Sequence, residues 1–201
     1  LSIRRQRQMC IRDSSRAVYG EGMWREMKTG REFYAKPRSN EDLSKRIWDP
    51  YNEGRPVEPI PHDAQFTLPQ PTSIYGATKL AQENILRAWC GAFRVPLSIL
   101  RLQNVYGEGQ SPINSYTGII NLFHKVARNG QAIQVYEDGL ITRDFVHVDD
   151  VARALLRVAQ VSGSQDHVLD IGSGVSTTIL EAAQELSLIH ISEPTRPRLS
   201  S

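Results

Sequence analysis

A tyrosine and a lysine lie four residues apart in the segment PTSIYGATKLAQEN, residues 71–84. If this segment is helical, Tyr75 and Lys79 share one face, because side chains at positions i and i+4 are neighbours. An ammonium group beside a phenol favours the phenolate and lowers the phenol pKa toward neutrality. Such a tyrosine can act as general acid or base in an alcohol–ketone interconversion. The YxxxK spacing alone is common, however, and is more often a solvated helix face.

Ser15 makes the pair more informative. It lies in SSRAVYGEG, residues 14–22, where Ala17–Tyr19 suit the end of a buried strand and the glycines stop it. If this strand lies beside the Tyr75 helix, the Ser15 hydroxyl can bond to the same reacting oxygen. Serine, tyrosine and lysine together handle protons without a metal ion or a nucleophile.

The elements that must position these residues alternate between strands and helices. Hydrophobic spacing predicts helices over residues 73–90, 118–130, 150–160 and 176–186, and strands within residues 95–107, 131–136, 145–148 and 167–171. The run over 95–107 lacks alternation, which is typical of a buried parallel strand. A strand, a helix and a second such strand form a βαβ unit, so the sequence predicts an α/β fold with a parallel sheet.

Two further expectations concern the helix ends and the connection before Tyr75. Ala77, Ala81, Ile85 and Ala88 should form the buried stripe of the 73–90 helix, with Gly91 ending it. Asp149, and Ser176 or Thr177, should cap the last two helices. Residues 23–70 have weak periodicity and should form a long connection with one short helix near residues 40–47.

Composition limits the classes of function. The 201 residues carry a formal net charge of +2, with 40% hydrophobic and 23% charged residues, as in a globular protein. No run of 18 apolar residues predicts a membrane span, and no secretory signal is recognised, so we expect a cytoplasmic protein without membrane partners. Two cysteines without metal-ligand spacing fit a reducing compartment. Asp149 and Asp150 lack a third carboxylate at a fixed offset, so we expect no metal.

The positive charge lies at the ends of the chain. Residues 1–13 and 187–201 are net basic, whereas the residues between them are mildly acidic. No aromatic or groove-reading pattern accompanies the basic ends, so we expect no nucleic-acid partner. Both ends resemble translated sequencing-adapter sequence. We therefore expect two non-native tails flanking a folded region over residues 14–186.

Five segments in order carry a family resemblance: SSRAVYG, SIYGATK, LRLQNVYGEGQ, DGLITRDFVHVDDVARA and LDIGSG. Together they resemble the extended short-chain dehydrogenase/reductase superfamily, the NAD-dependent nucleotide-sugar epimerases and dehydratases. The resemblance covers residues 14–186. It implies a Rossmann-type parallel sheet that holds NAD and a smaller C-terminal region for a nucleotide-diphosphate sugar, a dTDP- or UDP-sugar. It also implies a homodimer formed through the Tyr75 helix.

The resemblance assigns the catalytic and cofactor roles residue by residue. Tyr75 matches the catalytic base and Ser15 the catalytic serine or threonine. Lys79 matches the lysine that holds the nicotinamide ribose and tunes the tyrosine. Leu102 falls where the backbone passes the nicotinamide.

The substrate roles are also assigned by the resemblance. Asn104 matches an asparagine near the substrate phosphates, and Arg143 matches the arginine that meets the pyrophosphate. Ile133 and Val135 fall where similar enzymes line the base pocket. Each polar residue has a plainer alternative, since Asn104 can cap a turn and Arg143 can pair with a neighbouring aspartate.

The chain departs from the family pattern at its start. The strand–GxxGxxG–helix that cradles the cofactor phosphates is not recognised, nor is the acidic residue that reads the ribose hydroxyls. We therefore expect an incomplete Rossmann domain, its second half only, over residues 14–110 with an insert at 21–70. Residues 111–186 should be mostly substrate-binding, with one strand returning to the Rossmann sheet. Such a fragment should be inactive on its own.

The residues after Ser15 discriminate between reactions. Similar 4,6-dehydratases place an Asp–Glu pair where this chain has Arg16 and Ala17. The pattern therefore favours a 4-epimerase acting through a transient 4-keto sugar, and is most similar to the dTDP-L-rhamnose 4-epimerase group. A dehydratase, a keto-sugar reductase and a non-catalytic regulator of the same superfamily are the alternatives. The sequence leaves the sugar nucleotide and the choice between NAD and NADP open.

Overall fold

The computed structural model describes residues 10–50, 55–111, 118–161, 166–187 and 191–195. The chain divides into two compact units. Unit 1 comprises the chain up to Asn40 with Asp49–Leu102 and Ala152–Ile171. Unit 2 comprises Glu41–Trp48, Gln103–Val151 and the chain from Gly172.

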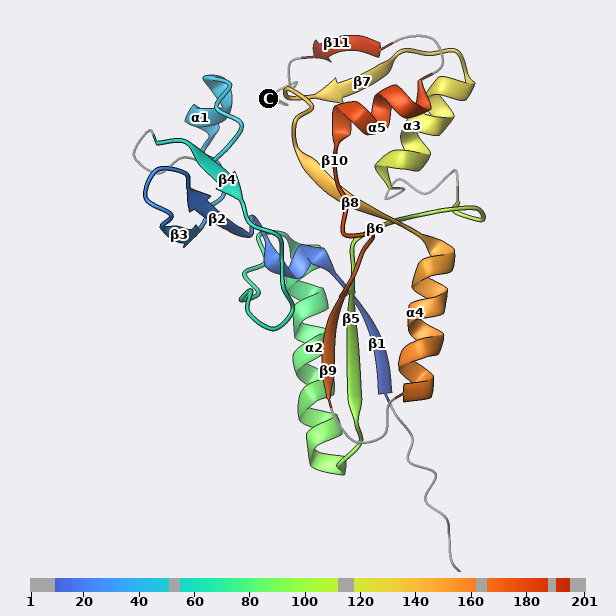
Figure 1. Ribbon diagram of the computed structural model, residues 1–201. Coiled ribbons are helices and arrows are strands. Elements are labelled where there is room, and N and C mark those ends of the chain that lie inside the picture. Colours follow the sequence, from blue (N-terminus) through green and yellow to red (C-terminus); the bar gives the residue numbers. More distant parts are fainter. Residues whose placement is uncertain (1–9, 51–54, 112–117, 162–165, 188–190, 196–201) are drawn as a thin grey trace, which may run out of the picture. The chain divides into compact units, whose positions relative to one another are not determined.

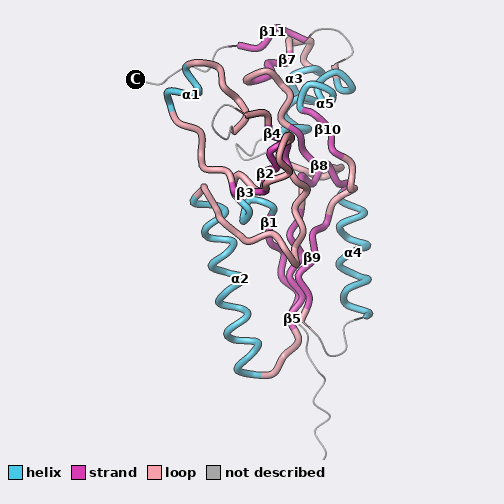
Figure 2. Tube along the Cα trace, turned by 60° about the vertical axis from the view of Figure 1, so that its left-hand side comes forward, coloured by secondary structure: helices cyan, strands magenta, loops and turns pink. Residues whose placement is uncertain are grey.

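The centre of unit 1 is a three-stranded parallel sheet (Figure 1). Its strands are β1 (Cys10–Ser15), β5 (Leu97–Leu102) and β9 (His167–Ile171), in the order β1-β5-β9. Helices α2 (Ile74–Phe93) and α4 (Val148–Val161) lie on opposite faces of this sheet in both views (Figures 1 and 2). Five of the six residues of β5 are buried, as a strand covered on both faces requires. The predicted α/β fold with a parallel sheet is confirmed.

The start of the sheet differs from the prediction in two ways. Strand β1 covers Cys10–Ser15, so the four residues before the expected boundary at residue 14 already belong to a strand. After Ser15 the chain turns into a short 3-10 helix, η1 (Arg16–Tyr19), instead of continuing as a strand. Val18 and Tyr19 are nevertheless fully buried, as predicted. The assignment of residues 1–13 and 187–201 as non-native stays a prediction.

Helix α2 packs on the sheet with a different face from the one that its apolar pattern predicted. The alanines and Ile85 of the expected buried stripe are exposed. The buried positions are Gly76, Glu83 and Cys90, and Leu97 and Ile99 of β5 pack around Cys90. The prediction from hydrophobicity was wrong because the side of the helix that faces the sheet carries Glu83, which is paired with Arg101 of β5. The helix also continues past Gly91 to Phe93, and Arg94 caps it in the left-handed conformation.

The predicted long connection before α2 contains a small antiparallel sheet. Its strands are β2 (Met23–Glu26), β3 (Glu32–Tyr34) and β4 (Val57–Pro59), in the order β3-β2-β4. The Arg25 guanidinium of β2 pairs with Glu32 of β3 at 2.9 Å and Glu58 of β4 at 3.4 Å. The expected short helix is present as α1 (Asn40–Ser44).

Unit 2 contains two small sheets and two further helices. One sheet orders β10 (Ser176–Thr178), β8 (Thr142–His147) and β6 (Asn104–Tyr106), and the other pairs β11 (Ile191–Thr195) with β7 (Ile133–Tyr136). Helices α3 (Ile119–Arg128) and α5 (Ile179–Leu186) pack around Phe123 and Ala183. The segment predicted as one strand over 95–107 is therefore divided between β5 in unit 1 and β6 in unit 2.

Two helix starts in the second half of the chain also differ from the prediction. Helix α4 begins at Val148, which places Asp149 in its first turn and not at its cap. Helix α5 is capped by Thr178, whose hydroxyl accepts from the Glu181 amide at 3.1 Å in a capping box. Among the described helices, none is long and apolar enough to cross a membrane.

Candidate active site

Ser15 and Leu102 lie at the carboxyl ends of neighbouring strands, directly opposite each other in the register of β1 and β5. Ligands of open α/β sheets bind at this edge. The Ser15 Oγ accepts a hydrogen bond of 3.2 Å from the Ala17 amide and so caps η1. A hydroxyl oxygen that accepts a bond still has its hydrogen to donate. The cap therefore orients Ser15 while leaving its O–H for a ligand oxygen.

Tyr75 and Lys79 lie in the first turns of α2, which starts where Ser73 accepts from the Gly76 amide at 3.1 Å. The Lys79 Nζ is 5.9 Å from the centroid of the Tyr75 ring, so the two side chains share a face as their spacing predicts. Tyr75 is 56% exposed, whereas the Lys79 side chain is 14% exposed. The Lys79 ammonium pairs with the Asp13 carboxylate at 2.9 Å. The phenol is thus accessible and the cation beside it is held in place.

Gly76 allows α2 to approach the segment that follows Ser15. A Cβ at this position would lie 2.3 Å from the Ala17 carbonyl oxygen, so a side chain has no room there. The residue directly after Tyr75 therefore contacts the residue whose amide Ser15 accepts. This contact brings the two elements together. The convergence of Ser15, Tyr75 and Lys79 on one reacting oxygen stays a prediction.

Beneath this edge lies a buried polar network that the sequence patterns did not reveal. Arg101 of β5 donates to Glu83 of α2 through two bonds of 3.0 and 2.8 Å, and to the Tyr19 hydroxyl at 3.0 Å. The Tyr19 hydroxyl donates to the Asp170 carboxylate of β9, with distances of 2.9 and 3.0 Å to its two oxygens. Glu83 and Tyr19 are fully buried and Arg101 is 2% exposed. The spacing of Tyr75, Lys79 and Glu83, four residues from one to the next, could have indicated that Glu83 lies on the same side of the helix.

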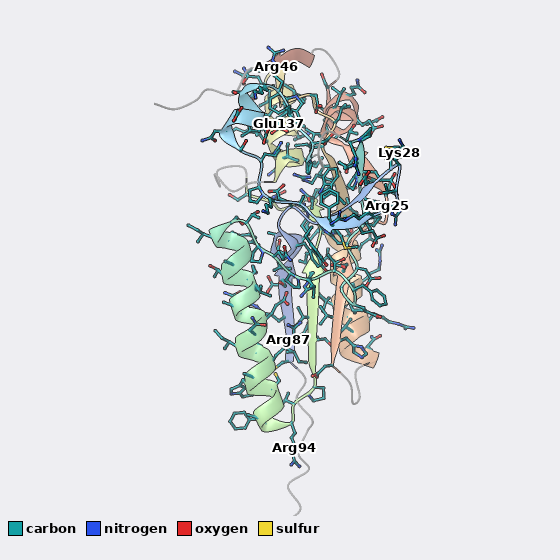
Figure 3. All side chains as sticks on the ribbon, turned by 90° about the vertical axis from the view of Figure 1, so that its left-hand side faces the viewer. Arg25, Lys28, Arg46, Arg87, Arg94 and Glu137 are labelled. Atoms are coloured by element: carbon teal, nitrogen blue, oxygen red, sulfur yellow. The ribbon has the colours of Figure 1, made fainter. Side chains whose placement is uncertain are left out.

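The network changes the pKa values of its members. Burial alone would raise the pKa of Glu83, but the Arg101 guanidinium, together with Ser14 and Arg87, lowers it. Burial would lower the pKa of Arg101, but its hydrogen bonds to Glu83 and Tyr19 raise it. Burial raises the pKa of Tyr19 and of Asp170. Glu83 and Arg101 therefore form a charged pair, with Tyr19 as a neutral bridge to Asp170. Arg87, labelled in Figure 3, lies 3.4 Å from Glu83 on the same helix.

In unit 2, Asn104 opens strand β6, and its Oδ1 is buried with no hydrogen-bond partner among the described residues. Such an oxygen is costly unless a ligand or water satisfies it. Ile133 and Val135 are each 1% exposed and pack in the core with Phe123. Alternation along β7 leaves Gln134 exposed between them. The expected place of Ile133 and Val135 in a base pocket stays a prediction.

Arg143 lies in β8, and its guanidinium donates to the Thr142 carbonyl oxygen at 2.8 Å. The neighbouring Asp144 is engaged elsewhere. Its carboxylate accepts from the Ser173 amide and hydroxyl at 2.7 and 2.8 Å and from the Gly174 amide at 2.9 Å. Asp144 thus stabilises the turn that follows β9. The glycine–serine–glycine sequence at residues 172–174 therefore forms a turn held by this carboxylate.

The polar groups of unit 1 suit one half of a dinucleotide. Ser15 ends β1 opposite Leu102 of β5, and Tyr75 and Lys79 lie in the first turns of α2. A hydroxyl, a phenol and an ammonium group suit a ribose and a reacting alcohol, and they fit the nicotinamide end of NAD. No group of three residues suited to hold a metal ion is found in the described parts of the chain.

Sequence comparison places this arrangement among known proteins. The family model for the NAD dependent epimerase/dehydratase family matches residues 11–172. The dTDP-L-rhamnose 4-epimerase of Burkholderia thailandensis is 51% identical over 171 residues, which are 85% of this chain and 46% of that protein. The chain thus spans about half the length of this relative.

Solved structures agree on the fold. UDP-glucose 4-epimerase from Thermotoga maritima, solved with UDP-glucose, matches with a TM-score of 0.66 at 24% identity, over 94% of this chain and 51% of that one. MoeE5 in complex with UDP-glucose and NAD matches with a TM-score of 0.62 at 27% identity, over 92% of this chain and 51% of that one. The similarity to the Thermotoga maritima enzyme, at 24% identity, supports the fold alone.

Proposed function

Because this chain belongs to the NAD-dependent epimerase/dehydratase family, we propose that it is part of a nucleotide-sugar 4-epimerase that acts through a transient 4-keto sugar. One observation carries the choice of reaction. Arg16 and Ala17 follow Ser15 in η1, at the positions where the resemblance places the acidic pair of the dehydratases. Without that pair, the Ser15–Tyr75–Lys79 set supports oxidation and reduction at one carbon but not the loss of water. The identity to a dTDP-L-rhamnose 4-epimerase supports the same choice.

Each group of unit 1 has a defined task in this proposal. Tyr75 takes the proton of the sugar C4 hydroxyl and later returns it, because its phenol is accessible at the start of α2. Ser15 donates a hydrogen bond to the C4 oxygen, and Lys79 stabilises the phenolate. NAD, when bound, would supply the hydride chemistry at C4. Lys79 and the backbone at Leu102 would hold its nicotinamide ribose end.

The nucleotide end of the substrate has different requirements. A pyrophosphate carries negative charge, and a planar guanidinium can bind two of its oxygens at once. We assign this role to Arg143, with Asn104 beside the phosphates, and the unpartnered Asn104 oxygen supports a ligand there. The sugar itself needs few contacts, because it must present both faces at C4. We place the reaction in the cytoplasm, on dTDP- or UDP-sugars.

Replacing Arg143 with alanine in the full-length enzyme should raise the KM for the nucleotide sugar. Losing a hydrogen bond to a charged group costs about 1.5–3 kcal/mol. At about 1.4 kcal/mol per factor of ten, KM should rise roughly 10- to 150-fold. The effect on kcat should be smaller, because phosphates are held equally in the ground and transition states. Arg143→Lys should recover only part of the loss, and steady-state kinetics with an unchanged KM would remove Arg143 from the substrate site.

We further propose that the full-length enzyme is a homodimer formed through α2. The face of α2 opposite Glu83 is apolar and exposed, with Ile74 at 88% and Ile85 at 66% exposure. Alanines at positions 81, 88 and 92 lie on the same face and would let a second helix approach closely. Large apolar groups on one exposed stripe mark an interaction surface.

Ile85→Glu should therefore convert the full-length dimer to a monomer, because a carboxylate in an apolar helix interface is not solvated. Light scattering coupled to size exclusion measures the mass directly. Met27→Glu is the matched control, since Met27 is equally exposed at 63% but lies in the small antiparallel sheet region. A wild-type enzyme that is monomeric, or an Ile85→Glu variant that stays dimeric, would exclude this interface.

The proposed function is tested by assaying the full-length enzyme with dTDP- and UDP-sugars without added NADH or NADPH. A 4-epimerase should interconvert the two C4 epimers to equilibrium with no net change in nicotinamide absorbance. In a parallel assay with added NADH or NADPH, stoichiometric consumption of the reduced cofactor would identify a reductase. Loss of water with a 4-keto-6-deoxy product would identify a dehydratase.

A further inference from the structure

We infer that Arg101 is a positioning residue that fixes the Ser15 hydroxyl relative to the Tyr75 phenol. The inference rests on the proposed function for its kinetic consequences. Arg101 is 2% exposed and lies below the sheet edge that carries Ser15 and Leu102, so it does not itself contact a ligand there. It acts through two neighbours, Glu83 and Tyr19, which belong to the two elements that carry the reacting groups.

The first link runs to the helix of Tyr75. Glu83 lies eight residues after Tyr75 and four after Lys79, so all three positions fall on one side of α2. The two parallel bonds between Arg101 and Glu83 form a fork, which fixes direction as well as distance. Rotation or sliding of α2 on the sheet would break this fork. The guanidinium therefore sets the rotation of α2 and with it the direction of the Tyr75 side chain.

The second link runs to the segment of Ser15. Tyr19 is the last residue of η1, and Ser15 is the cap of the same short helix. The Tyr19 hydroxyl is held between Arg101 at 3.0 Å and the Asp170 carboxylate at 2.9 Å. The guanidinium also lies 4.9 Å from the Tyr19 ring centroid, and the His62 ring packs against this ring at 4.4 Å. Tyr19 thus ties η1 to β5 and β9.

A purely stabilising role would not need this connectivity. A buried ion pair is often no more stable than packed apolar residues of the same volume. Here one guanidinium joins the helix of the proposed base to the turn of the proposed hydrogen-bond donor. Acid–base catalysis is sensitive to such placement, because a misplacement of about 1 Å can cost roughly 100-fold in rate.

The test is Tyr19→Phe in the full-length enzyme, which removes one hydroxyl and keeps the ring. We expect kcat to fall about 10- to 100-fold with the KM for the nucleotide sugar nearly unchanged. The matched control is Tyr34→Phe, which also removes a hydroxyl with a hydrogen bond, from the Leu68 amide at 2.9 Å. Tyr19→Phe should melt at a lower temperature than the control, because the buried Asp170 carboxylate loses this donor. Both variants should be folded at the assay temperature and differ in kcat.

A kcat for Tyr19→Phe that equals the control would overturn the inference, as would a fall in kcat that merely follows a loss of folded protein. If Tyr19→Phe does not fold, Asp170→Asn replaces it, since it keeps the shape and weakens the hold on Tyr19; an unchanged kcat would again overturn the inference. A wild-type enzyme inactive on every dTDP- and UDP-sugar would count against the proposed function alone. In that case crystal structures decide, because the distance between Ser15 Oγ and Tyr75 Oη should change in the variant, and an unchanged distance would overturn the inference.

Discussion

Replacing Tyr75 with phenylalanine in the full-length enzyme should lower kcat by about 100- to 10,000-fold, the usual contribution of a general acid–base group. The ring is retained, so packing at the start of α2 should be preserved. Tyr75 is 56% exposed and its hydroxyl faces a ligand in the proposal, so the melting temperature should be unchanged. The KM for the nucleotide sugar should change little, because most of the binding energy comes from the nucleotide diphosphate.

The comparison needs a second phenylalanine variant. Tyr34→Phe lies in the small antiparallel sheet and should keep wild-type kcat. Lys79→Met should also lower kcat, because the phenolate loses the ammonium beside it. A Tyr75→Phe enzyme with more than about a tenth of wild-type kcat would remove Tyr75 from the acid–base role.

Replacing Glu83 with alanine should destabilise the protein by about 3–5 kcal/mol, the cost of leaving a buried charge without its partner. Arg101 would keep its charge, because a guanidinium stays protonated in proteins, and this charge would be buried without its carboxylate. Chemical denaturation of the full-length enzyme measures this loss in the transition that reports on unit 1. Glu41→Ala is the control, because Glu41 makes a similar helical pair with Lys45 at the surface and should change stability little.

The Glu83 effect should depend on pH with a defined sign. The folded-state pKa of Glu83 lies below its ordinary value of 4.5, so its stabilisation is present above that pH and is lost as the pH falls through the lower value. The difference in the free energy of unfolding between wild type and Glu83→Ala should therefore become smaller at acidic pH. The raised pKa of Asp170 acts in the opposite sense but is common to both proteins. A difference below about 1 kcal/mol at neutral pH would mean that Arg101 finds another partner.

The sequence predicted the fold class and the elements that carry the proposed site. Periodicity located α2, α3, β7 and β9, because apolar residues repeat at the spacing of each element. The Tyr75–Lys79 pair was found because four residues span one helical turn. Predictions from local sequence patterns were wrong where contacts between residues far apart in the sequence determine the local structure. The strand after Ser15 became η1 because Tyr19 is held by Arg101 and Asp170, which follow it by 82 and 151 residues.

The orientation of α2 could not be predicted for a related reason. Its more hydrophobic face is exposed, and its sheet face carries Glu83, whose burial requires Arg101. The sequence of α2 alone does not indicate that Glu83 has a partner on strand β5. The short strands of the 23–70 connection were missed because three or four residues are too few to show alternation.

The most direct test of the account is the fate of deuterium at C4 of the sugar. The full-length enzyme is incubated with a dTDP- or UDP-sugar that carries deuterium at this carbon, and the product epimer is analysed by mass spectrometry and NMR. The account predicts that the deuterium stays at C4 in the inverted product, because the hydrogen removed from this carbon is the one returned to it, while Tyr75 exchanges only the hydroxyl proton. Product whose C4 deuterium has been replaced by hydrogen from water would contradict transient oxidation at C4 and with it the proposed 4-epimerase.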